Sequence, residues 1–295
     1  MTNCLKMNRL QKQQNKQNAN SYLPRQDLYI YYLNGRMQTD KALFQDNFIG
    51  NWEEEDDSFL FFSSPAPRQI DILLDLQPQL SFVDSYRMSY EQWLGEIFST
   101  FEYGRFRIRP PWETSENHSG EFSDQLQVIL DPGLVFGTGT HSTTRDCLAA
   151  LELASGTQDF KTVMDLGTGT GILALAAARL GSQRTVAIDL NFLAAKTAAK
   201  NVRLNQLENR VLILQGNAQD VIAYPADLVI ANIHYDIMRH LISSQGFLAK
   251  KRFIISGLLR SQAKDIAGSL TNYPVKILKH WTPDGIWHTF YGKRI

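Results

Sequence analysis

The sequence lacks several features that mark specialised classes of protein. Its 295 residues include two cysteines, Cys4 and Cys147, which are far apart and show no metal-ligand spacing. This excludes a disulfide framework and a zinc site of the Cys-x-x-Cys type, and it favours a reducing compartment. No apolar run reaches the roughly 18 residues of a membrane-spanning helix. We therefore expect a cytoplasmic protein with neither a membrane segment nor a metal site.

An excess of charge of one sign is also lacking. Lys and Arg total 30 and Asp and Glu total 30, so the formal net charge is zero. A protein that depends on bulk electrostatic attraction to nucleic acid is normally basic. We therefore expect no dominant nucleic-acid binding, although a local basic patch remains open.

Four regions follow one another along the chain. Residues 1–26 hold five basic residues and no acidic one, and their Gln- and Asn-rich composition predicts a disordered polar tail; an organellar targeting segment is the alternative. Residues 27–89 predict a small α+β domain of three or four strands that serves in binding or positioning. Residues 90–113 predict a linker helix and a strand. Residues 114–295 alternate strand and helix, and we expect a monomer.

Local patterns predict the elements of the first three regions. Aromatic and β-branched runs favour strands, helical spacing or a capping residue favours helices, and a row of acidic residues favours a solvated loop. The expected strands are 28–33, 58–62, 70–76, 82–88 and 104–109, the expected helices are 39–48 and 90–98, and the acidic loop is 53–57. Arg105, Arg107 and Arg109 share one face of the strand 104–109, where a solvated edge is favoured over an anion site.

The fourth region predicts a doubly wound α/β domain. Strands are expected at 126–130, 162–166, 185–188, 211–214, 227–231, 253–256, 275–278 and 287–291, and helices at 145–154, 172–180, 191–205, 235–249 and 261–270. Repeated strand–helix units imply a parallel sheet with right-handed crossovers. The last two strands have no helix between them, which predicts a hairpin and one antiparallel strand.

The most informative stretch is Asp165-Leu-Gly167-Thr-Gly169-Thr-Gly171, between a buried strand and an alanine-rich helix. Glycines accept positive φ and let backbone amides approach a ligand closely. The spacing differs from the dinucleotide pattern G-x-G-x-x-G and favours S-adenosylmethionine. The three glycines would lie against its methionine and ribose parts, and Asp165 could bind the ammonium group directly or through water.

Other strand ends add to this predicted site, because ligands of open α/β sheets bind at the carboxyl ends of the strands. Asp189 follows the glycines by about 20 residues, the distance expected of a carboxylate that binds ribose hydroxyls. The alternative for Asp189 is an ordinary helix N-cap. Asn217 and Ala218 are weaker candidates for the adenine edge.

Asn232, at the end of the strand 227–231, is the candidate catalytic residue. Its amide oxygen could accept a hydrogen bond from an amine and hold the nitrogen lone pair in line with methyl and sulfur, since methyl transfer depends mainly on positioning and desolvation. The amine must arrive neutral. His141, His234 and Asp236 are open alternatives for assisting its deprotonation, and the last two could instead cap the following helix.

A second glycine-rich stretch runs from Asp131 to Thr144, with the sequence Asp-Pro-Gly-Leu-Val-Phe-Gly-Thr-Gly-Thr-His-Ser-Thr-Thr. Three glycines, four threonines and one histidine favour ligand contact over a simple connector. Thr143 or Thr144 is expected to cap the helix 145–154, whose N-terminus would then face the ligand.

Together these residues resemble one known family. The 131–144 loop, Asp165-Leu-Gly-Thr-Gly-Thr-Gly-Ile-Leu-Ala174, Asn232-Ile and Ser256-Gly-Leu-Leu are similar to segments of the ribosomal protein methyltransferases called PrmA. So is the linker from Tyr90-Glu-Gln-Trp to Arg109-Pro-Pro-Trp-Glu. That family acts on the large-subunit protein at the base of the ribosomal stalk.

The resemblance implies a class I S-adenosylmethionine-dependent methyltransferase domain, Rossmann-like with a seven-stranded, mostly parallel sheet, and an N-terminal ferredoxin-like domain that recognises the substrate. It also implies N-methylation of lysine side chains and of an N-terminal amine. It places Phe136, Thr138, Thr140 and His141 at the methionine end of the cofactor. The chain departs from the family at His234-Tyr-Asp and matches it poorly before Tyr90.

Other functions stay open at this point. The acceptor could be a lysine of a different protein, or the fold could be a scaffold that binds ribosomal components without catalysis. A nicotinamide-dependent oxidoreductase is disfavoured by the glycine spacing and by the lack of an evident hydride-transfer partner.

Overall fold

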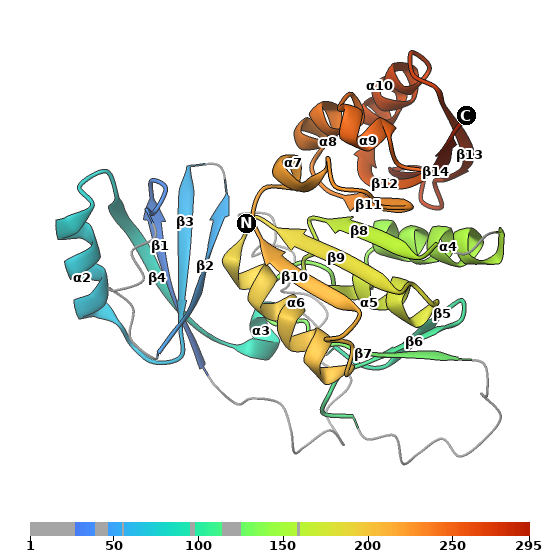
Figure 1. Ribbon diagram of the computed structural model, residues 1–295. Coiled ribbons are helices and arrows are strands. Elements are labelled where there is room, and N and C mark those ends of the chain that lie inside the picture. Colours follow the sequence, from blue (N-terminus) through green and yellow to red (C-terminus); the bar gives the residue numbers. More distant parts are fainter. Residues whose placement is uncertain (1–26, 39–46, 55, 95–97, 114–124, 158–159) are drawn as a thin grey trace. The chain divides into compact units, whose positions relative to one another are not determined.

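The computed structural model describes residues 27–38, 47–54, 56–94, 98–113, 125–157 and 160–295. The chain divides into two compact units, one that ends at Phe98 and one from Ser99 to Ile295 (Figure 1). The division falls inside the predicted linker 90–113. The predicted tail 1–26 lies outside the described residues, as does nearly all of the predicted helix 39–48.

The first unit is built on a four-stranded antiparallel sheet. Its strands are β1 (Asp27–Asn34), β2 (Phe48–Glu54), β3 (Asp57–Phe62) and β4 (Ser81–Ser89), in the order β2-β3-β1-β4. This order, with the first strand between the third and the fourth, is that of the ferredoxin-like fold. The prediction of a small α+β domain of three or four strands is confirmed, although β2 was not among the expected strands.

One expected strand of this unit is a helix. Residues 70–76 belong to α2 (Pro67–Leu76), which begins with proline at its first turn, where the missing N–H costs nothing. Ile70 and Leu73 are buried against the sheet, and their spacing of three is helical. The weak alternation was misleading because a short amphipathic helix and a strand share some apolar positions.

The expected acidic loop is mostly strand. Glu53 and Glu54 belong to β2 and pair with Ser58 and Asp57 of β3, so the paired strands reach into both ends of the acidic run. The Asp57 carboxylate accepts hydrogen bonds from Tyr32 Oη at 2.9 Å and Asn34 Nδ2 at 3.1 Å. These partners on β1 offset the cost of an acidic residue at a strand end.

A short helix and a three-stranded sheet occupy the predicted linker and the residues after it. The helix is α3 (Tyr90–Leu94); the strands are β5 (Phe101–Tyr103), β6 (Phe106–Arg109) and β7 (Leu126–Ile129), in that order. Phe106 and Ile108 are fully buried, as the alternation predicted. Arg109 Nη1 donates to the carbonyl of Glu113 at 2.6 Å, so this arginine secures the chain that follows.

The second unit is built on a seven-stranded sheet in the order β10-β9-β8-β11-β12-β14-β13. Its strands are β8 (Thr162–Leu166), β9 (Arg184–Asp189), β10 (Val211–Gln215), β11 (Leu228–Asn232), β12 (Arg252–Leu259), β13 (Val275–Trp281) and β14 (Trp287–Arg294). The pairs among β8 to β12 are parallel, and β14 is antiparallel to both β12 and β13. The predicted parallel sheet with a terminal hairpin is confirmed.

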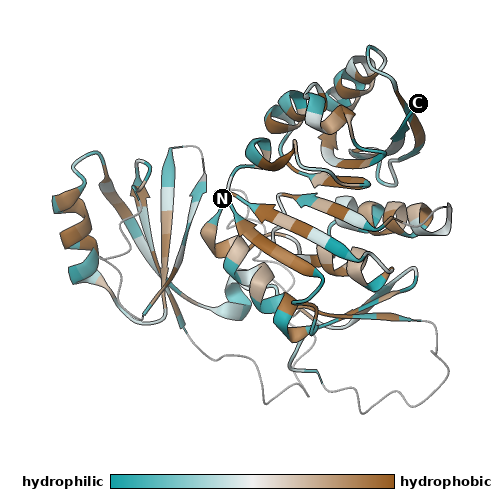
Figure 2. Cartoon of the chain, in the orientation of Figure 1, coloured by the Kyte–Doolittle hydropathy of each residue, from teal (hydrophilic) through white to brown (hydrophobic). Residues whose placement is uncertain are grey.

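Helices cover both faces of this sheet (Figure 1). One face carries α4 (Ser142–Thr157), α5 (Ile172–Arg179) and α6 (Phe192–Leu204); the other carries α7 (Ala218–Val221), α8 (Tyr235–Ile242), α9 (Gln245–Leu248) and α10 (Arg260–Leu270). Hydrophobic residues concentrate in the strands between them (Figure 2). None of the helices in the described part of the chain is long and apolar enough to cross a membrane.

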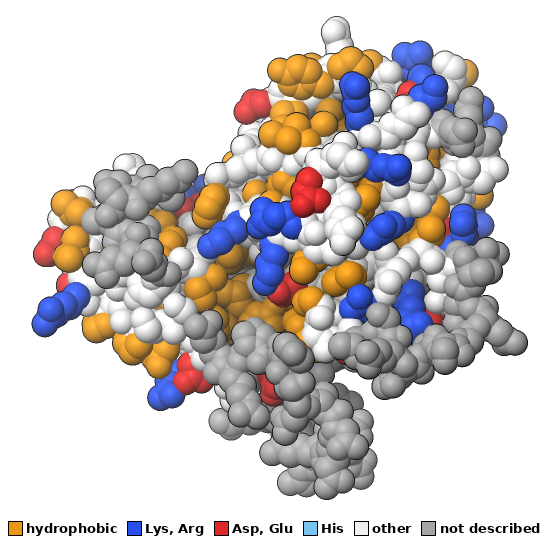
Figure 3. All heavy atoms as spheres, turned by 60° about the horizontal axis from the view of Figure 1, so that its bottom comes forward, with side chains coloured by type: hydrophobic (Ala, Val, Ile, Leu, Met, Phe, Trp, Pro, Cys, Tyr) orange, Lys and Arg blue, Asp and Glu red, His pale blue; other side chains and the backbone are white. Residues whose placement is uncertain are grey.

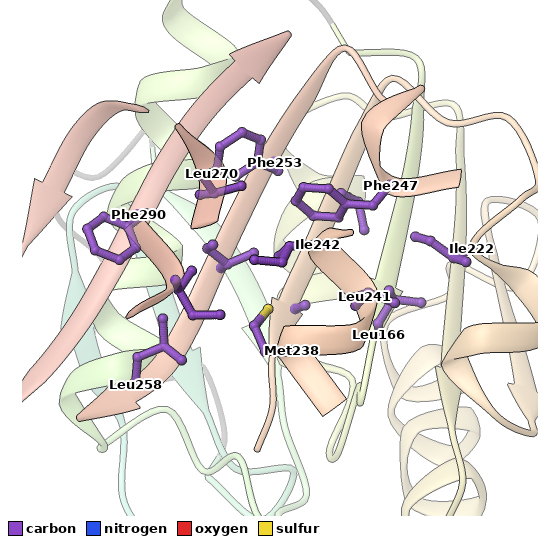
Figure 4. Packing of buried hydrophobic residues seen from close by; sticks show 14 of the residues in the cluster. Leu166, Ile222, Met238, Leu241, Ile242, Phe247, Phe253, Leu258, Leu270 and Phe290 are labelled. Carbon is purple, nitrogen blue, oxygen red and sulfur yellow. The ribbon is translucent and has the colours of Figure 1, made fainter. Parts of the chain in front are cut away.

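The helices α7 to α10 form a continuous apolar core against their face of the sheet. Met238, Leu241 and Ile242 of α8 belong to the same buried cluster as Phe253 and Leu258 of β12 (Figure 4). All five side chains are at most 2% exposed. Burial of each such side chain stabilises the fold by about 1.5–3 kcal/mol, so this core fixes the strands whose ends carry the site.

The expected helix 235–249 is two helices. The chain leaves α8 after Ile242, and Ser244 caps α9 because its Oγ accepts a hydrogen bond from Phe247 N at 3.2 Å. Serine competes for backbone hydrogen bonds and favours such caps over helix interiors.

Charge is divided unequally between the two units. Residues 27–98 include 13 acidic and 4 basic residues, whereas residues 99–295 include 17 acidic and 21 basic residues. On the face drawn in Figure 3, Lys and Arg side chains stand singly or in small groups among uncharged ones. The zero net charge of the whole chain therefore combines an acidic segment, residues 27–98, with an excess of basic residues in 1–26 and in 99–295.

Two buried asparagines, Asn201 in α6 and Asn205 directly after it, hold the chain where it enters the 131–144 loop. Asn205 exchanges hydrogen bonds with the backbone N–H and C=O of Ile129, at 2.9 and 2.6 Å. Asn201 does the same with Asp131, at 2.8 and 2.9 Å, and its Nδ2 also donates to Thr170 O at 2.9 Å. The two side-chain amides act as a neighbouring strand would, so the loop starts from a fixed position.

We expect Asn201→Leu to destabilise the fold by about 3 kcal/mol, because it leaves buried backbone groups of Asp131 and Thr170 without partners. Urea denaturation would measure this loss. Arg203→Ala, on the exposed face of the same helix, is the matched control and should change stability by no more than about 0.5 kcal/mol. Equal midpoints for the two variants would contradict the anchoring role.

Candidate active site

The glycine turn after β8 adopts a conformation that only glycine supports easily. Gly167, Gly169 and Gly171 have φ of +71°, +55° and +86°. A Cβ built on Gly169 would lie 2.5 Å from the carbonyl oxygen of Phe136. The turn therefore packs directly against the 131–144 loop, and the two glycine-rich stretches form one structure.

Asp189 lies at the carboxyl end of β9 and is bonded to this turn. Its Oδ2 accepts from Gly169 N and its Oδ1 from Asn191 N, both at 2.9 Å. Burial raises the pKa of Asp189, and the two hydrogen bonds oppose that shift. The alternative of a simple N-cap is wrong: Asn191 is the cap of α6 and accepts from Leu193 N and Ala194 N.

Asp165 lies beneath the turn rather than on its surface. It is 1% exposed, and its Oδ2 accepts a hydrogen bond from Thr168 Oγ1 at 2.6 Å. Burial raises its pKa to about 7, and the nearby charge of Asp189 adds to the shift. Its visible role is to shape the turn, and the predicted contact with a ligand ammonium stays a prediction.

The middle of the 131–144 loop lies over the turn. Thr170 Oγ1 donates to Gly137 O at 2.6 Å, and a Cβ on Gly139 would meet the Phe101 ring at 2.6 Å. The hydroxyls of Thr138 and Thr140 are 2.8 Å apart, and the Phe136 side chain is 55% exposed. The loop thus holds an exposed aromatic ring above a fixed backbone.

A chain of hydrogen bonds joins this loop to Asn232. Asn232 Nδ2 donates to Thr143 Oγ1 at 3.2 Å, and Thr143 Oγ1 lies 2.8 Å from His141 Nδ1. The backbone N–H of Thr143 also donates to Nδ1, at 3.3 Å. Because donors converge on Nδ1, the proton of a neutral ring belongs on Nε2. Burial lowers the pKa of His141, which favours the neutral ring, while Asp284 opposes the shift.

The expectation that Thr143 or Thr144 caps the next helix is wrong. Helix α4 begins at Ser142, so both threonines lie in its first turn. Thr143 uses its hydroxyl on His141 and Asn232 instead. Thr144 Oγ1 is buried and finds no hydrogen-bond partner among the described residues.

The β13–β14 hairpin adds two residues that sequence analysis missed. The Trp287 ring packs edge-on against His141, with ring centroids 5.3 Å apart, and Phe136 packs against the same imidazole at 5.6 Å. Asp284 Oδ2 accepts from Ser142 Oγ at 3.0 Å. The turn at 282–285 was visible in the sequence, but only the antiparallel direction of β14 brings it to this edge of the sheet.

The other proton-acceptor candidates stand apart from this chain of hydrogen bonds. His234 Nδ1 and Asp236 Oδ2 are 3.3 Å apart at the start of α8, and both side chains are about 70% exposed. Within the described residues, neither forms a hydrogen bond or an ion pair with Asn232. Asn217 uses its Oδ1 to cap α7 through Gln219 N at 2.9 Å. The structure therefore brings together His141 and Asn232 but not His234 or Asp236.

The fold and this site define a class of protein. Five parallel strands, an antiparallel hairpin, a glycine turn after the first strand of the sheet and an acidic residue after the second are the arrangement of class I S-adenosylmethionine-dependent methyltransferases. Residues 77–294 match the model of the family described as ribosomal protein L11 methyltransferase (PrmA). The chain belongs to this family, as the resemblance predicted.

Individual relatives agree with this assignment. The chain is 42% identical over 168 residues to the ribosomal protein L11 methyltransferase of Geobacillus kaustophilus, covering 56% of this chain and 52% of the relative. It is 38% identical over 192 residues to that of Anoxybacillus flavithermus, covering 64% and 60%. The match thus spans between half and two thirds of these relatives' length.

A solved structure is also similar. The ribosomal protein L11 methylase of Lactobacillus delbrueckii subsp. bulgaricus matches with a TM-score of 0.58 and 29% identity, covering 66% of this chain and 98% of that one.

We expect Gly169→Ala to destabilise the protein more than Gly181→Ala. Both glycines have positive φ, so both substitutions introduce backbone strain. Only at Gly169 would the new Cβ meet a backbone atom, whereas nothing lies within 4 Å at Gly181. The clash should cost about 2 kcal/mol beyond the shared strain. Thermal unfolding of both variants checks this, and equal shifts in Tm would show that the loop does not rest on the turn.

Proposed function

We propose that this protein is an S-adenosylmethionine-dependent protein N-methyltransferase that acts as a cytoplasmic monomer. Its proposed acceptors are lysine side chains, an N-terminal amine, or both, on a large-subunit ribosomal protein. The names of the relatives point to ribosomal protein L11 as the acceptor protein. The observation that carries the proposal is the hydrogen-bonded chain from His141 through Thr143 to Asn232, next to the glycine turn.

The residues around the glycine turn fit an adenosine and a sulfonium. Each oxygen of Asp189 accepts one backbone N–H, so each keeps a lone pair for a ribose hydroxyl. Leu190, the next residue, is 70% exposed and offers apolar surface for adenine. When bound, S-adenosylmethionine supplies a methyl group on a positively charged sulfur.

The methionine end of the cofactor would be held by the loop and the turn. Gly167, Gly169 and Gly171 offer backbone without side chains, and Asp165 supports them from below through Thr168. The other proposed contacts come from the loop over the turn, namely Phe136, Thr138, Thr140 and His141. Apolar and neutral groups on this side exclude water, which would otherwise solvate the charged sulfur.

Asn232 is the proposed catalytic residue. Thr143 holds its Nδ2, and no described residue donates a hydrogen bond to its Oδ1. The free carbonyl oxygen can accept an N–H from the acceptor amine and direct the lone pair toward the methyl group. The neutral His141 fixes Thr143 and therefore the orientation of the amide; it is also the one candidate proton acceptor that the structure connects to Asn232.

The first unit supports a basic protein as the acceptor. Ribosomal proteins bind anionic RNA and carry excess Lys and Arg, so an acidic partner attracts them. Residues 27–98 carry 13 acidic and 4 basic residues, and the described part of this segment includes a ferredoxin-like sheet. This favours substrate recognition by the first unit, while the second unit performs the transfer.

The direct test combines the purified protein, labelled S-adenosylmethionine and unmethylated ribosomal protein L11. Label in L11 supports the proposal, and intact-mass analysis would give the number of methyl groups. Label that appears only in other proteins of a whole-cell extract would favour the alternative acceptor. Lack of heat on titration with the cofactor would favour a scaffold without catalysis.

Two substitutions should separate cofactor binding from methyl transfer. We expect Asp189→Ala to weaken cofactor binding about tenfold or more, because it removes the partner of the ribose and of Gly169 N. We expect Asn232→Ala to leave cofactor affinity nearly unchanged and to slow transfer about a hundredfold, the cost of losing orientation. Calorimetry and single-turnover kinetics measure the two effects. Unchanged turnover in Asn232→Ala would rule out its positioning role.

A further inference from the structure

A row of buried polar side chains lies between α4 and the sheet and has no part in the reaction described above. Asp146 on α4 is 2% exposed, and Ser256 on β12 and Thr289 on β14 are fully buried. The interface between a helix and the middle of a sheet is normally apolar, and carboxyl groups are rarely buried there. A carboxyl group at this position therefore calls for a physical reason.

The three side chains form a hydrogen-bonded chain with a single direction. Thr289 Oγ1 donates to Asp146 Oδ2 at 3.3 Å, and the hydroxyls of Ser256 and Thr289 are 2.5 Å apart. An ionised carboxylate can only accept, so Thr289 must donate to it. Thr289 then accepts from Ser256. The carboxylate at the end of the chain fixes the direction of both hydroxyls.

Both ends of this chain adjoin Asn232. Ser256 is the register partner of Asn232 on the neighbouring parallel strand. A Cβ on Gly257, the next residue, would lie 3.1 Å from Asn232 Oδ1. On α4, Asp146 follows Thr143 by three residues, and Thr143 accepts from the Asn232 amide. Asn232 is thus held between two elements that Asp146, Thr289 and Ser256 fasten together.

We propose that Asp146 is a positioning residue for methyl transfer, which holds β12 and β14 against α4 so that the Asn232 amide keeps its orientation. This inference rests on the proposed function.

The same carboxylate costs stability. Burial raises the pKa of Asp146 to about 6; the hydrogen bond from Thr289 lowers it and the charge of Asp284 raises it further. The folded protein therefore favours the protonated form more than the unfolded chain does. Stability falls as the pH rises from the unfolded pKa, near 4, through the folded pKa, and it stays reduced above that. A neutral isostere should remove this penalty.

The other titrating groups near Asp146 can be told apart from it. Tyr103 and Cys147 have raised pKa values and Asp284 has a lowered one, so these three keep one protonation state between pH 5 and 8. His141 on the adjacent loop has a lowered pKa and titrates below its usual range. His141 and Asp165 can both mimic Asp146 in a pH profile, because burial raises the pKa of Asp165 to about 7, and substitution of Asp146 distinguishes it from both.

The test measures transfer and stability of Asp146→Asn together. At pH 8, with ribosomal protein L11 and labelled S-adenosylmethionine, we expect kcat to fall about tenfold or more, the scale of a misplaced reacting group. Cofactor affinity should stay within about twofold, and Tm should rise. A purely structural residue would lower Tm without this selective loss of kcat.

The pH profile supplies a second readout. In the wild type, log(kcat/KM) should rise with pH at slope one below the pKa of the lysine amine, which must lose its proton. Below about pH 6 the slope should be two, because Asp146 must also ionise. Asp146→Asn should lose the break near pH 6. A break that persists belongs to His141 or Asp165 and would overturn the role of Asp146.

Two further variants keep the proposal testable if Asp146→Asn folds poorly. Thr289→Val conserves shape and breaks the chain in its middle, so it should also lower kcat. Thr144→Val removes a buried hydroxyl without a partner from the same helix and should leave kcat unchanged. Equal kcat values for Thr289→Val, Thr144→Val and the wild type would overturn the proposal. A wild type that transfers no methyl group would instead contradict the proposed function itself.

Discussion

The second unit depends on one buried amide. Asn201 of α6 bonds to both backbone groups of Asp131 and to the carbonyl of Thr170, so one side chain links a helix, a loop and the glycine turn. Thr170 then bonds to Gly137 with its own hydroxyl. The 131–144 loop and the glycine turn, more than 30 residues apart in the sequence, therefore keep one fixed geometry, because buried polar groups must find partners. Neither stretch could form the site alone.

The site therefore has two parts. One is the glycine turn with Asp189, which backbone geometry fixes, and the other is the group of side chains that pack around His141. Backbone hydrogen bonds and glycine conformations fix the turn and Asp189. Side chains from three separate segments meet at His141, where Phe136 and Trp287 flank a neutral imidazole. The first part suits a cofactor common to many enzymes. The second part differs more readily from protein to protein, because packed side chains change without altering the turn.

Much of this fold could be predicted from the sequence, because its signals are local. Apolar strands, alanine-rich helices and the residues at strand ends follow from periodicity, and they led to Asp189 and Asn232. Thr143, Asn201 and Trp287 were missed as site residues because their roles depend on partners distant in the sequence. Thr143 resembles an ordinary cap until Asn232 lies beside it. The predictions for residues 70–76 and 235–249 were wrong for a local reason, because short amphipathic segments and serine caps give weak signals.

The antiparallel direction of β14 has a consequence for how the site is assembled during synthesis. Because β14 runs against its neighbours, Trp287 at its start reaches the carboxyl edge of the parallel strands. The glycine turn, Asp189 and Asn232 all precede Asp284 and Trp287 in the chain. They leave the ribosome first, so the nascent chain can form its cofactor half before the hairpin exists. The packing of Trp287 against His141 therefore forms after them, and a chain still being translated lacks it.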